Sequence, residues 1–361
     1  MKSRLNTRII IRRIVLGVIL GALMVGLLSI VIALGGFPVG ASLRALIGGS
    51  VGSWDAVFSA TLVRATPLLL TGLAVTLAFR AGVLNIGAEG QLLAGAAAAT
   101  LVGMTVSPAV GSLALPLELA AAAGAGVAWT IVPSWLRRRF GVNEVISTIM
   151  MNFLAASLVS YLVRGPLQEP THTYPQSPTL SEVARLPPIA DGTRLHWGFI
   201  LAVLLALGLG WGLRFTAVGF RVSAAGASPR AAREAGRIDV AGLTTRVFLA
   251  SGAIAGLAGG VEIAGVTFAL YDNLSPGYGY TAIAVALLAG LRPAWTIPSS
   301  LVFGALSAGA AAMQRDAAVP AGFVEFIQAV IVLTLLAVPF LVARLSGLRA
   351  ARAALSLSAR G

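Results

Sequence analysis

The stretch GVLNIGAEGQ (residues 82–91) places Asn85, Glu89 and Gln91 between two strongly apolar runs. The run that follows is about 20 residues long, the length that an α-helix needs to cross the roughly 30 Å hydrocarbon core of a bilayer. The run that precedes the stretch is shorter, because Arg64 and Arg80 bracket only fifteen residues. Glycine-rich breaks are tolerated at membrane depth only where protein or water covers the free backbone groups. The stretch therefore predicts two membrane helices that are joined by an unusual polar turn.

The composition of the whole chain is that of an integral membrane protein. Of its 361 residues, 57% are hydrophobic and 11% are charged, and the mean hydropathy is +0.90, far from the balance of a soluble domain. The net charge of +13 does not indicate nucleic-acid binding, because the basic residues cluster between apolar segments instead of forming a stripe with aromatic neighbours. The absence of cysteine excludes disulfides and thiolate chemistry.

The apolar runs predict an all-α, polytopic fold with about ten transmembrane helices. The first run is too long for a signal peptide and lacks a cleavage pattern, so we expect a retained helix there. Residues 42–62, which contain Arg44, Asp55 and several glycines, look interfacial instead. The ten predicted helices lie near residues 14–34, 64–81, 88–107, 111–134, 143–163, 196–215, 244–266, 276–291, 295–313 and 323–343.

The distribution of arginine and lysine predicts the orientation of the chain. Cytoplasmic flanks of membrane helices retain positive charge, and most of the 26 basic residues fall on one side when the N-terminus is placed inside. Ten helices then put both termini in the cytoplasm. We expect a single transmembrane domain over residues 1–361, with a basic cytoplasmic tail over residues 345–361.

Two hydrophilic connections interrupt the apolar pattern. Residues 164–195 are rich in proline and predict an extended external loop with little regular structure. Residues 216–243 form a cytoplasmic connection, in which Ser228 and Pro229 are typical of a helix start and Gly236 of a helix end. A short cytoplasmic helix is therefore predicted there.

Several kinds of chemistry are excluded by the residues that are missing. A P-loop needs a lysine that reaches the phosphates, but the only lysine is Lys2, so the chain has no ATP site of the Walker type. The two histidines, His172 and His196, have no cysteine or pair of carboxylates at ligand spacing, so no metal site is predicted. No catalytic residues are therefore expected.

The turn at residues 82–91 leaves two interpretations open. In one, Asn85, Glu89 and Gln91 line or gate a polar path through the membrane, because ionisable groups in membrane segments are functional by default. In the other, the segment is an ordinary cytoplasmic turn whose Glu89 is solvated or paired with Arg80.

A second group of polar residues opens the helix predicted over 143–163. Asn143 fits a helix cap, and Glu144 in the first turn is favoured by the helix dipole. Asn152 lies on roughly the same face as Thr148 and Glu144. Glu144 and Asn152 are therefore further candidates for residues that line the path.

The helix predicted over 244–266 carries Gly252, Gly256 and Gly260 at four-residue spacing. Small residues at this spacing let two helices approach closely, so we expect these glycines to serve packing. Glu262 follows near the outer end of the helix, where its side chain is expected to reach the membrane interface.

Five motifs, in this order, resemble the permease subunits of bacterial ABC importers for nucleosides and simple sugars. The resemblance covers about residues 65–340 and is closest to the larger of two paired permeases, whose turn reads NIGAEGQ. The motifs are FRAGVLNIGAEGQ (79–91), GVNEVISTIMMNF (141–153), GFRVSAAGASPRAAREAG (219–236), TAIAVALLAGLRP (281–293) and MQRDAAVPAGFVEFIQAVIVL (313–333).

This resemblance implies a multi-pass protein of the bacterial inner membrane with four kinds of partner: a second permease, a cytoplasmic ABC ATPase, an extracytoplasmic substrate-binding lipoprotein and the lipid bilayer. ATP and Mg²⁺ would be bound by the ATPase, with no cofactor in this chain. The stretch Gly226–Gly236 is similar to the family's coupling helix. The resemblance therefore implies that the ATPase is contacted by Pro229, Arg230, Arg233, Glu234 and Gly236.

The rival function is a proton-coupled secondary transporter, in which Glu89, Glu144 or Glu262 would carry the proton. For the substrate, a nucleoside base favours aromatic stacking. The candidates for such stacking are Phe79, Phe153, Tyr161 and Phe268, and their spacing does not rank them.

Overall fold

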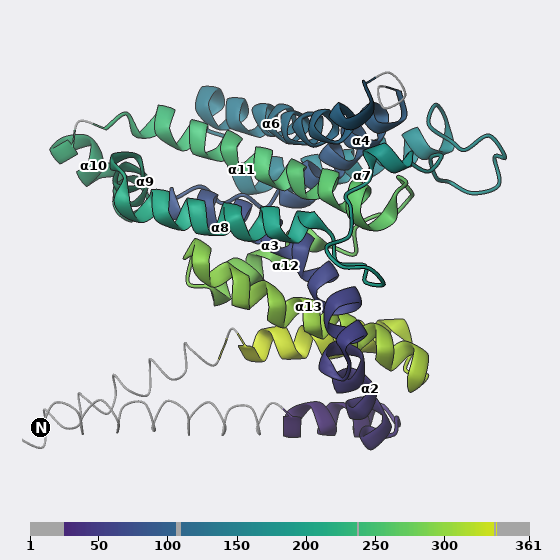
Figure 1. Ribbon diagram of the computed structural model, residues 1–361. Helices are drawn as coiled ribbons and strands as arrows, with labels where there is room; N and C mark the ends of the chain where they lie inside the picture. Colours follow the sequence, from purple (N-terminus) through teal and green to yellow (C-terminus); the bar gives the residue numbers. More distant parts are fainter. Residues whose placement is uncertain (1–24, 106–109, 237, 336, 338–361) are drawn as a thin grey trace, which may run out of the picture. The chain divides into compact units, whose positions relative to one another are not determined.

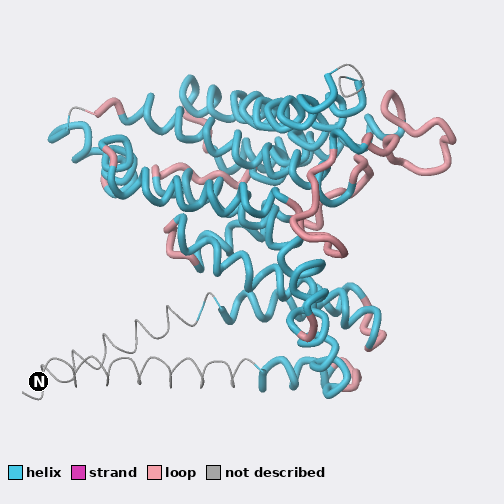
Figure 2. The backbone as a smooth tube through the Cα atoms, in the orientation of Figure 1, coloured by secondary structure: helices cyan, strands magenta, loops and turns pink. Residues whose placement is uncertain are grey.

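The computed structural model describes residues 25–105, 110–236, 238–335 and 337 (Figure 1). These residues are largely helical and contain no β-strand (Figure 2), which confirms the predicted all-α class. Six of the described helices are long and apolar enough to cross a membrane, and four shorter ones are apolar. The protein is thus a polytopic membrane protein, as predicted.

The chain divides into two compact units, each described here by itself. The smaller unit takes its described residues from the chain up to Gly52 and from Leu306 onward. It contains the helical residues Val25–Leu34, α2 (Val39–Val51), the end of α13 (Pro293–Asp316) and Ala321–Leu335. Its core includes Leu28, Ile32 and Met313. Residues 14–24 of the first predicted helix and the basic tail over 345–361 lie outside the described residues.

The larger unit, Ser53–Ala305, contains the candidate site. Its helices are mostly α-helices, with short π-helical or 3-10 segments (labelled η) among them. They are η1 (Ala56–Thr61), α3 (Leu62–Arg80), α4 (Ala88–Thr105), η2 (Gly111–Leu113), α6 (Ala114–Phe140), α7 (Glu144–Arg164), η3 (Glu182–Ala184), α8 (Trp197–Phe215), α9 (Ala217–Ala227), α10 (Pro229–Gly236), α11 (Val240–Glu262), η4 (Ile263–Thr267), α12 (Tyr278–Leu288) and the first half of α13.

The predicted start of the second apolar helix is wrong. The second apolar helix does not begin at residue 64, because η1 continues into α3 and makes one span of 25 residues, Ala56–Arg80. Arg64 does not end the helix, because its guanidinium folds back along the same helix and donates to the Ala60 carbonyl at 3.4 Å. Part of the segment 42–62 that was expected to be interfacial thus belongs to this span.

Helix α11 packs at the centre of the larger unit against α3, α4 and α6 (Figure 1). A Cβ atom on Gly256 would clash with the Ala122 carbonyl and lie 2.8 Å from the Cα of Gly126. Gly252 and Gly260 likewise face α6, opposite Thr130 and Ala122. The prediction that these glycines serve close helix packing is confirmed.

The expectation that Glu262 reaches the interface is wrong. The side chain is buried, and its Oε2 has no hydrogen-bond partner among the described residues. The physical reason is that Glu262 belongs to α11, and this helix packs at the centre of the larger unit against α3, α4 and α6. It continues through η4 as a span of 28 residues, Val240–Thr267.

The connection over residues 165–196 has little regular structure, as predicted (Figure 2). It is nevertheless held in place, because its backbone bonds to the segment that follows α11. The Ser177 amide donates to the Leu270 carbonyl at 2.7 Å, and the Leu180 amide donates to the Phe268 carbonyl at 2.7 Å. Leu180, Ala184 and Leu186 in this connection are buried.

Glu169 organises the exposed end of this loop. Hydrogen bonds from Gln176 and then from Thr171 hold the pKa of Glu169 below its ordinary value of 4.5. Its carboxylate also accepts from the Tyr174 amide at 3.1 Å. A lowered pKa means that the ionised carboxylate stabilises the loop above pH 4.5 and that this stabilisation is lost as the pH falls through the pKa of the folded state.

We therefore expect Glu169→Gln to increase amide exchange at Tyr174 several-fold at pH 7, measured by hydrogen exchange with rates corrected for their intrinsic pH dependence. The difference from the unmodified chain should disappear below the pKa of Glu169. Glu182→Gln, which changes another exposed glutamate of the same loop, is the matched control and should change little. Equal exchange for both variants at pH 7 would contradict this role.

Candidate functional site

The turn after α3 redirects the chain back alongside the helices. Gly82 has a φ of +77°, a conformation that favours glycine. The amides of Gly82 and Val83 donate to the carbonyls of Phe79 and Ala78, each at 3.0 Å, which closes the end of α3. The chain then continues without helical structure until α4 begins at Ala88, and Asn85 falls within this non-helical stretch.

Asn85 is fully buried and is the centre of a hydrogen-bond network. Its Nδ2 donates to Gln91 Oε1 at 2.9 Å and to Ser251 Oγ at 2.8 Å. Its Oδ1 accepts from the Gly87 amide at 3.0 Å and from Gln91 Nε2 at 3.2 Å. Ser251 Oγ donates to the Ala74 carbonyl at 2.7 Å, which extends the network to α3. One side chain thus ties the turn to α3, α4 and α11.

Asn152 fastens the same segment to α7. Its Nδ2 donates to the Ile86 carbonyl at 2.9 Å, and its Oδ1 accepts from the Gly90 amide at 2.8 Å. The amide also lies 3.3 Å from the hydroxyl of Tyr280, which brings α12 into the group. Because a side-chain amide offers both donors and an acceptor, Asn152 can satisfy backbone groups that the break in the helix leaves free.

Glu89 caps the start of α12. The helix begins after Gly277, which has no side chain to serve as a cap. Glu89 Oε2 accepts from the Gly279 amide at 2.6 Å, and Ser275 also hydrogen-bonds to this carboxylate. A carboxylate at a helix N-terminus is favoured by the free N–H groups and by the helix dipole. Glu89 also lies in the first turn of α4, so the N-terminal ends of two helices meet at one carboxylate.

The alternative of a solvated turn, with Glu89 exposed or paired with Arg80, is wrong. Glu89 is 6% exposed. Arg80 instead donates to Ser223 Oγ at 3.1 Å and to the Leu291 carbonyl at 3.3 Å. The physical reason is that the chain turns inward at Gly82, which carries Glu89 away from the end of α3.

The network lies well inside the helices. At 1.5 Å per residue, Asn152 is about 12 Å from the first residue of α7, and Ser251 is about 16 Å from the first residue of α11. Ala74 is about 9 Å before the end of α3. Broken helices with free N-terminal ends near the middle of the membrane are the usual binding elements of transporters.

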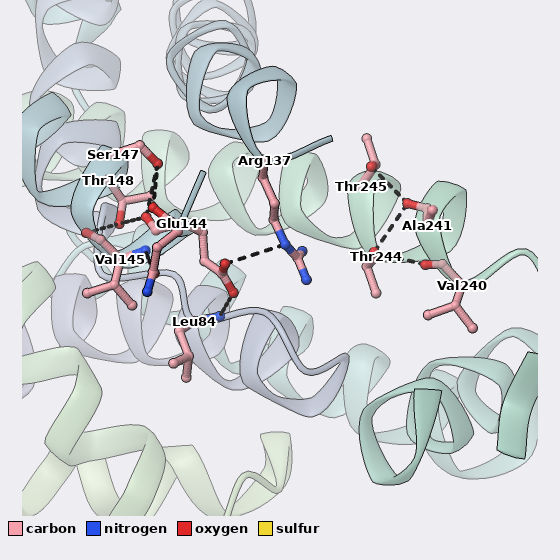
Figure 3. Close-up of polar contacts among 11 residues, drawn as sticks. Leu84, Arg137, Glu144, Val145, Ser147, Thr148, Val240, Ala241, Thr244 and Thr245 are labelled. Atoms are coloured by element: carbon pink, nitrogen blue, oxygen red, sulfur yellow. Dashed lines mark hydrogen bonds and ion pairs between the residues drawn. The ribbon is translucent and has the colours of Figure 1, made fainter. Parts of the chain in front are cut away.

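Glu144 is placed apart from this group. Asn143 caps α7 by accepting from the Val145 amide at 2.9 Å, as predicted. The Glu144 carboxylate lies 3.5 Å from Arg137 Nε and 3.4 Å from the Leu84 amide. Figure 3 shows Glu144 between these two groups. Glu144 therefore ties the α6–α7 corner to the turn after α3.

A cavity of about 410 Å³ adjoins this corner and the start of α10. It is lined by arginines and hydroxyl groups, among them Arg137, Arg233 and Thr244. Figure 3 shows the side chains of Arg137, Thr244 and Thr245 in this region.

The predicted short helix after residue 216 is confirmed as α10, which starts at Pro229 and ends at Gly236. The Ala231 amide donates to Ser228 Oγ at 3.3 Å, so Ser228 caps this helix. Arg230 and Glu234 form an ion pair of 3.1 Å, with side chains 90% and 69% exposed, and Arg233 is also exposed. Of the residues expected to contact a partner, Pro229, Arg230, Arg233 and Glu234 are thus exposed.

Helix α9, which the sequence did not predict, joins this segment to the turn after α3. A Cβ atom on Gly226 would clash with the Arg80 carbonyl. One on Gly82 would lie 3.4 Å from the Cα of Gly226. The end of α3 and α9 are therefore in direct backbone contact at these two glycines.

The structure brings together Asn85, Glu89, Gln91 and Asn152, and it places Glu144 at the corner. The sequence did not single out Ser251, Ser275, Gly279 or Tyr280, because their polar atoms come from distant segments. Of the aromatic candidates, Phe153 and Tyr161 lie on an exposed face of α7. The ring of Phe268 lies 4.8 Å from the Arg185 guanidinium, and Phe79 packs against the core.

The family described as the permease component of branched-chain amino acid transport systems matches residues 57–339. The chain belongs to this permease family. The match covers every helix of the network, from α3 to α12. The permease is thus a transport component rather than an enzyme, and the resemblance drawn from its motifs is confirmed.

The permease is also similar to named transport proteins. It is 41% identical to a glucose ABC transporter permease protein of Haloferax volcanii over 77% of this chain and 76% of the relative. It is 36% identical to a guanosine ABC transporter permease protein of Bacillus subtilis over 87% and 93%. It is 28% identical to a nucleoside ABC transporter permease protein of Lactococcus lactis subsp. cremoris over 78% and 79%. No solved structure matches the chain.

Proposed function

We propose that this permease forms the translocation path of an ATP-driven importer for nucleosides or related simple sugars. The observation that carries the proposal is its family membership, together with relatives named for guanosine, nucleoside and glucose transport that align over most of their length. Alternating access is driven by a partner ATPase, which binds the ATP and Mg²⁺. The chain resides in the cytoplasmic membrane with both termini inside.

The exposed helix α10 is the contact with that ATPase. Arg230, Arg233 and Glu234 point away from the larger unit and supply both signs of charge for a partner surface. The preceding helix, α9, contacts the end of α3 at Gly226. This contact gives the ATPase a mechanical route to the turn at residues 82–87. The remaining partners are a second permease and an extracytoplasmic substrate-binding lipoprotein.

The turn at residues 82–87 and its hydrogen-bond network correspond to the closed state of the translocation path. Asn85, Gln91 and Asn152 bond to one another or to backbone groups and are buried, while Glu89 holds the start of α12 against the start of α4. Separating these two helix starts releases amide and carboxylate groups that suit the hydroxyls of a sugar or a ribose. Glu144 supports the corner next to this path.

The test is the ATPase activity of the reconstituted transporter, which contains both permeases, the ATPase and the lipoprotein, as nucleosides and then simple sugars are added. We expect stimulation by one of these classes. Glu89→Gln should assemble normally but lose most of the stimulation, because the neutral amide is a weaker cap for α12. Arg230→Ala with Glu234→Ala should reduce binding of the ATPase itself.

Two results would overturn the proposal. One is the absence of stimulation by every nucleoside and simple sugar tested. The other is accumulation of substrate, driven by a proton gradient, in membranes that contain this chain without an ATPase. Normal stimulation in Glu89→Gln would remove Glu89 from the path and leave the transport function standing.

A further inference from the structure

A second cavity of the larger unit has a different character from the polar network. It has a volume of about 770 Å³ and lies between the end of α8, the start of α9, the end of α3 and the start of α13. Three arginines line it, and no carboxylate does. The other lining residues are mostly apolar or aromatic, namely Leu207, Gly210, Trp211, Leu213, Phe215, Phe220, Pro293, Ala294 and Trp295, with Ser223.

The positive charge of this groove is not neutralised within the larger unit. Arg80 donates hydrogen bonds to two uncharged groups, Ser223 Oγ and the Leu291 carbonyl. Arg214 and Arg292 are exposed, and among the described residues neither forms an ion pair with a carboxylate. The start of α13 lines the groove as well, and a helix N-terminus adds to the attraction for an anion.

The apolar part of the groove runs along α8 toward the arginines. Leu207 and Trp211 lie about 12 Å and 6 Å before the last residue of α8, with Arg214 next to that end. Trp211 and Trp295 are 63% and 59% exposed, as is typical of aromatic side chains at the boundary between hydrocarbon and headgroups. A molecule that fits must have an apolar chain on one side and a negative charge on the other.

We propose that this groove binds one anionic phospholipid, with its phosphate at Arg214 and Arg292 and an acyl chain along α8. Charge complementarity and the order of apolar and basic residues select a lipid over a free phosphate, which would leave the apolar half empty. Basic pockets between membrane helices are known to hold such headgroups. The groove shares no lining residue with the polar network around Asn85 or with α10.

The test is native mass spectrometry of the full-length chain in a mild detergent, titrated with phosphatidylglycerol or with phosphatidylcholine of the same acyl chains. We expect preferential retention of one phosphatidylglycerol. Arg214→Ala with Arg292→Ala should weaken its binding about thirtyfold and leave phosphatidylcholine unchanged. Arg221→Ala, which removes the same charge from an exposed position of α9 outside the groove, should change binding less than about threefold.

A second pair of variants tests the apolar half without changing charge. Gly210→Leu fills the groove next to Ala294, whose amide nitrogen lies 3.6 Å from the position of a Cβ atom. Gly208→Leu, where a Cβ atom meets nothing within 4 Å, is the control on the same helix. Gly210→Leu should weaken phosphatidylglycerol binding clearly more than Gly208→Leu, with thermal unfolding confirming that both variants are folded.

Three outcomes would overturn the proposal. They are equal retention of the two lipids, equal losses in the groove variants and their controls, and competition by millimolar glycerol 1-phosphate. The last result would show that the arginines recognise the phosphate group alone.

Discussion

Replacing Asn85 with leucine is expected to lower the free energy of unfolding by about 3 kcal/mol or more and to abolish substrate-stimulated ATPase activity. Leucine has a similar size but makes no hydrogen bonds, so the Gly87 amide and both polar atoms of Gln91 lose a buried partner. Each unsatisfied buried group costs about 1–3 kcal/mol. Unfolding in mixed micelles measures the stability, and the reconstituted transporter measures the activity.

The control for Asn85→Leu is a double-mutant cycle with Gln91→Leu. Replacing both partners of a hydrogen bond by apolar groups is far less costly than replacing one of them. The double variant should therefore lose less stability than the two single variants do in sum. Strict additivity, or a single variant as stable as the unmodified chain, would show that the network does not hold the turn.

Gly256→Leu is expected to prevent the chain from folding, with a loss of more than about 3 kcal/mol. The added side chain would meet the backbone of α6 at Ala122 and Gly126, and backbone atoms cannot rotate away as a flexible side chain can. The expected result is loss of monodisperse protein after extraction, measured by size-exclusion chromatography of a fluorescent fusion.

Gly124→Leu provides the comparison for this substitution. Gly124 lies on α6, and a Cβ atom there meets nothing within 4 Å. The same change of residue type in a membrane helix should then be tolerated. If Gly124→Leu and Gly256→Leu were extracted equally well, close contact between α6 and α11 would not be what holds the larger unit together.

Features that depend on neighbouring residues were predictable from the sequence. The apolar runs predicted the helices, Asn143 and Ser228 predicted two helix caps, and the spacing of Gly252, Gly256 and Gly260 predicted close packing. Each of these signals lies within one or two turns of the structure that it specifies. Because these signals are local, they predict where helices lie along the chain but say little about which helices pack against each other.

The role of Glu89 was not predictable, because the amide that it caps is 190 residues away. A carboxylate near a glycine-rich turn is equally typical of a solvated loop, and only the inward course of the chain after Gly82 distinguishes the two. Arg64 and Glu262 show the opposite difficulty. Charge suggested a helix start at Arg64 and an interfacial side chain at Glu262, but η1–α3 runs past Arg64 and the side chain of Glu262 is buried.

The loop over residues 165–196 has a consequence for the order in which the protein is made. Ser177 accepts a hydrogen bond from the Leu270 amide at 3.0 Å, and 93 residues separate the two. Ser177 therefore leaves the ribosome long before Leu270, the residue to which it bonds. While α8 to α11 are being synthesised and inserted, the loop lacks the backbone partners Phe268 and Leu270, so these hydrogen bonds form only after α11 is complete.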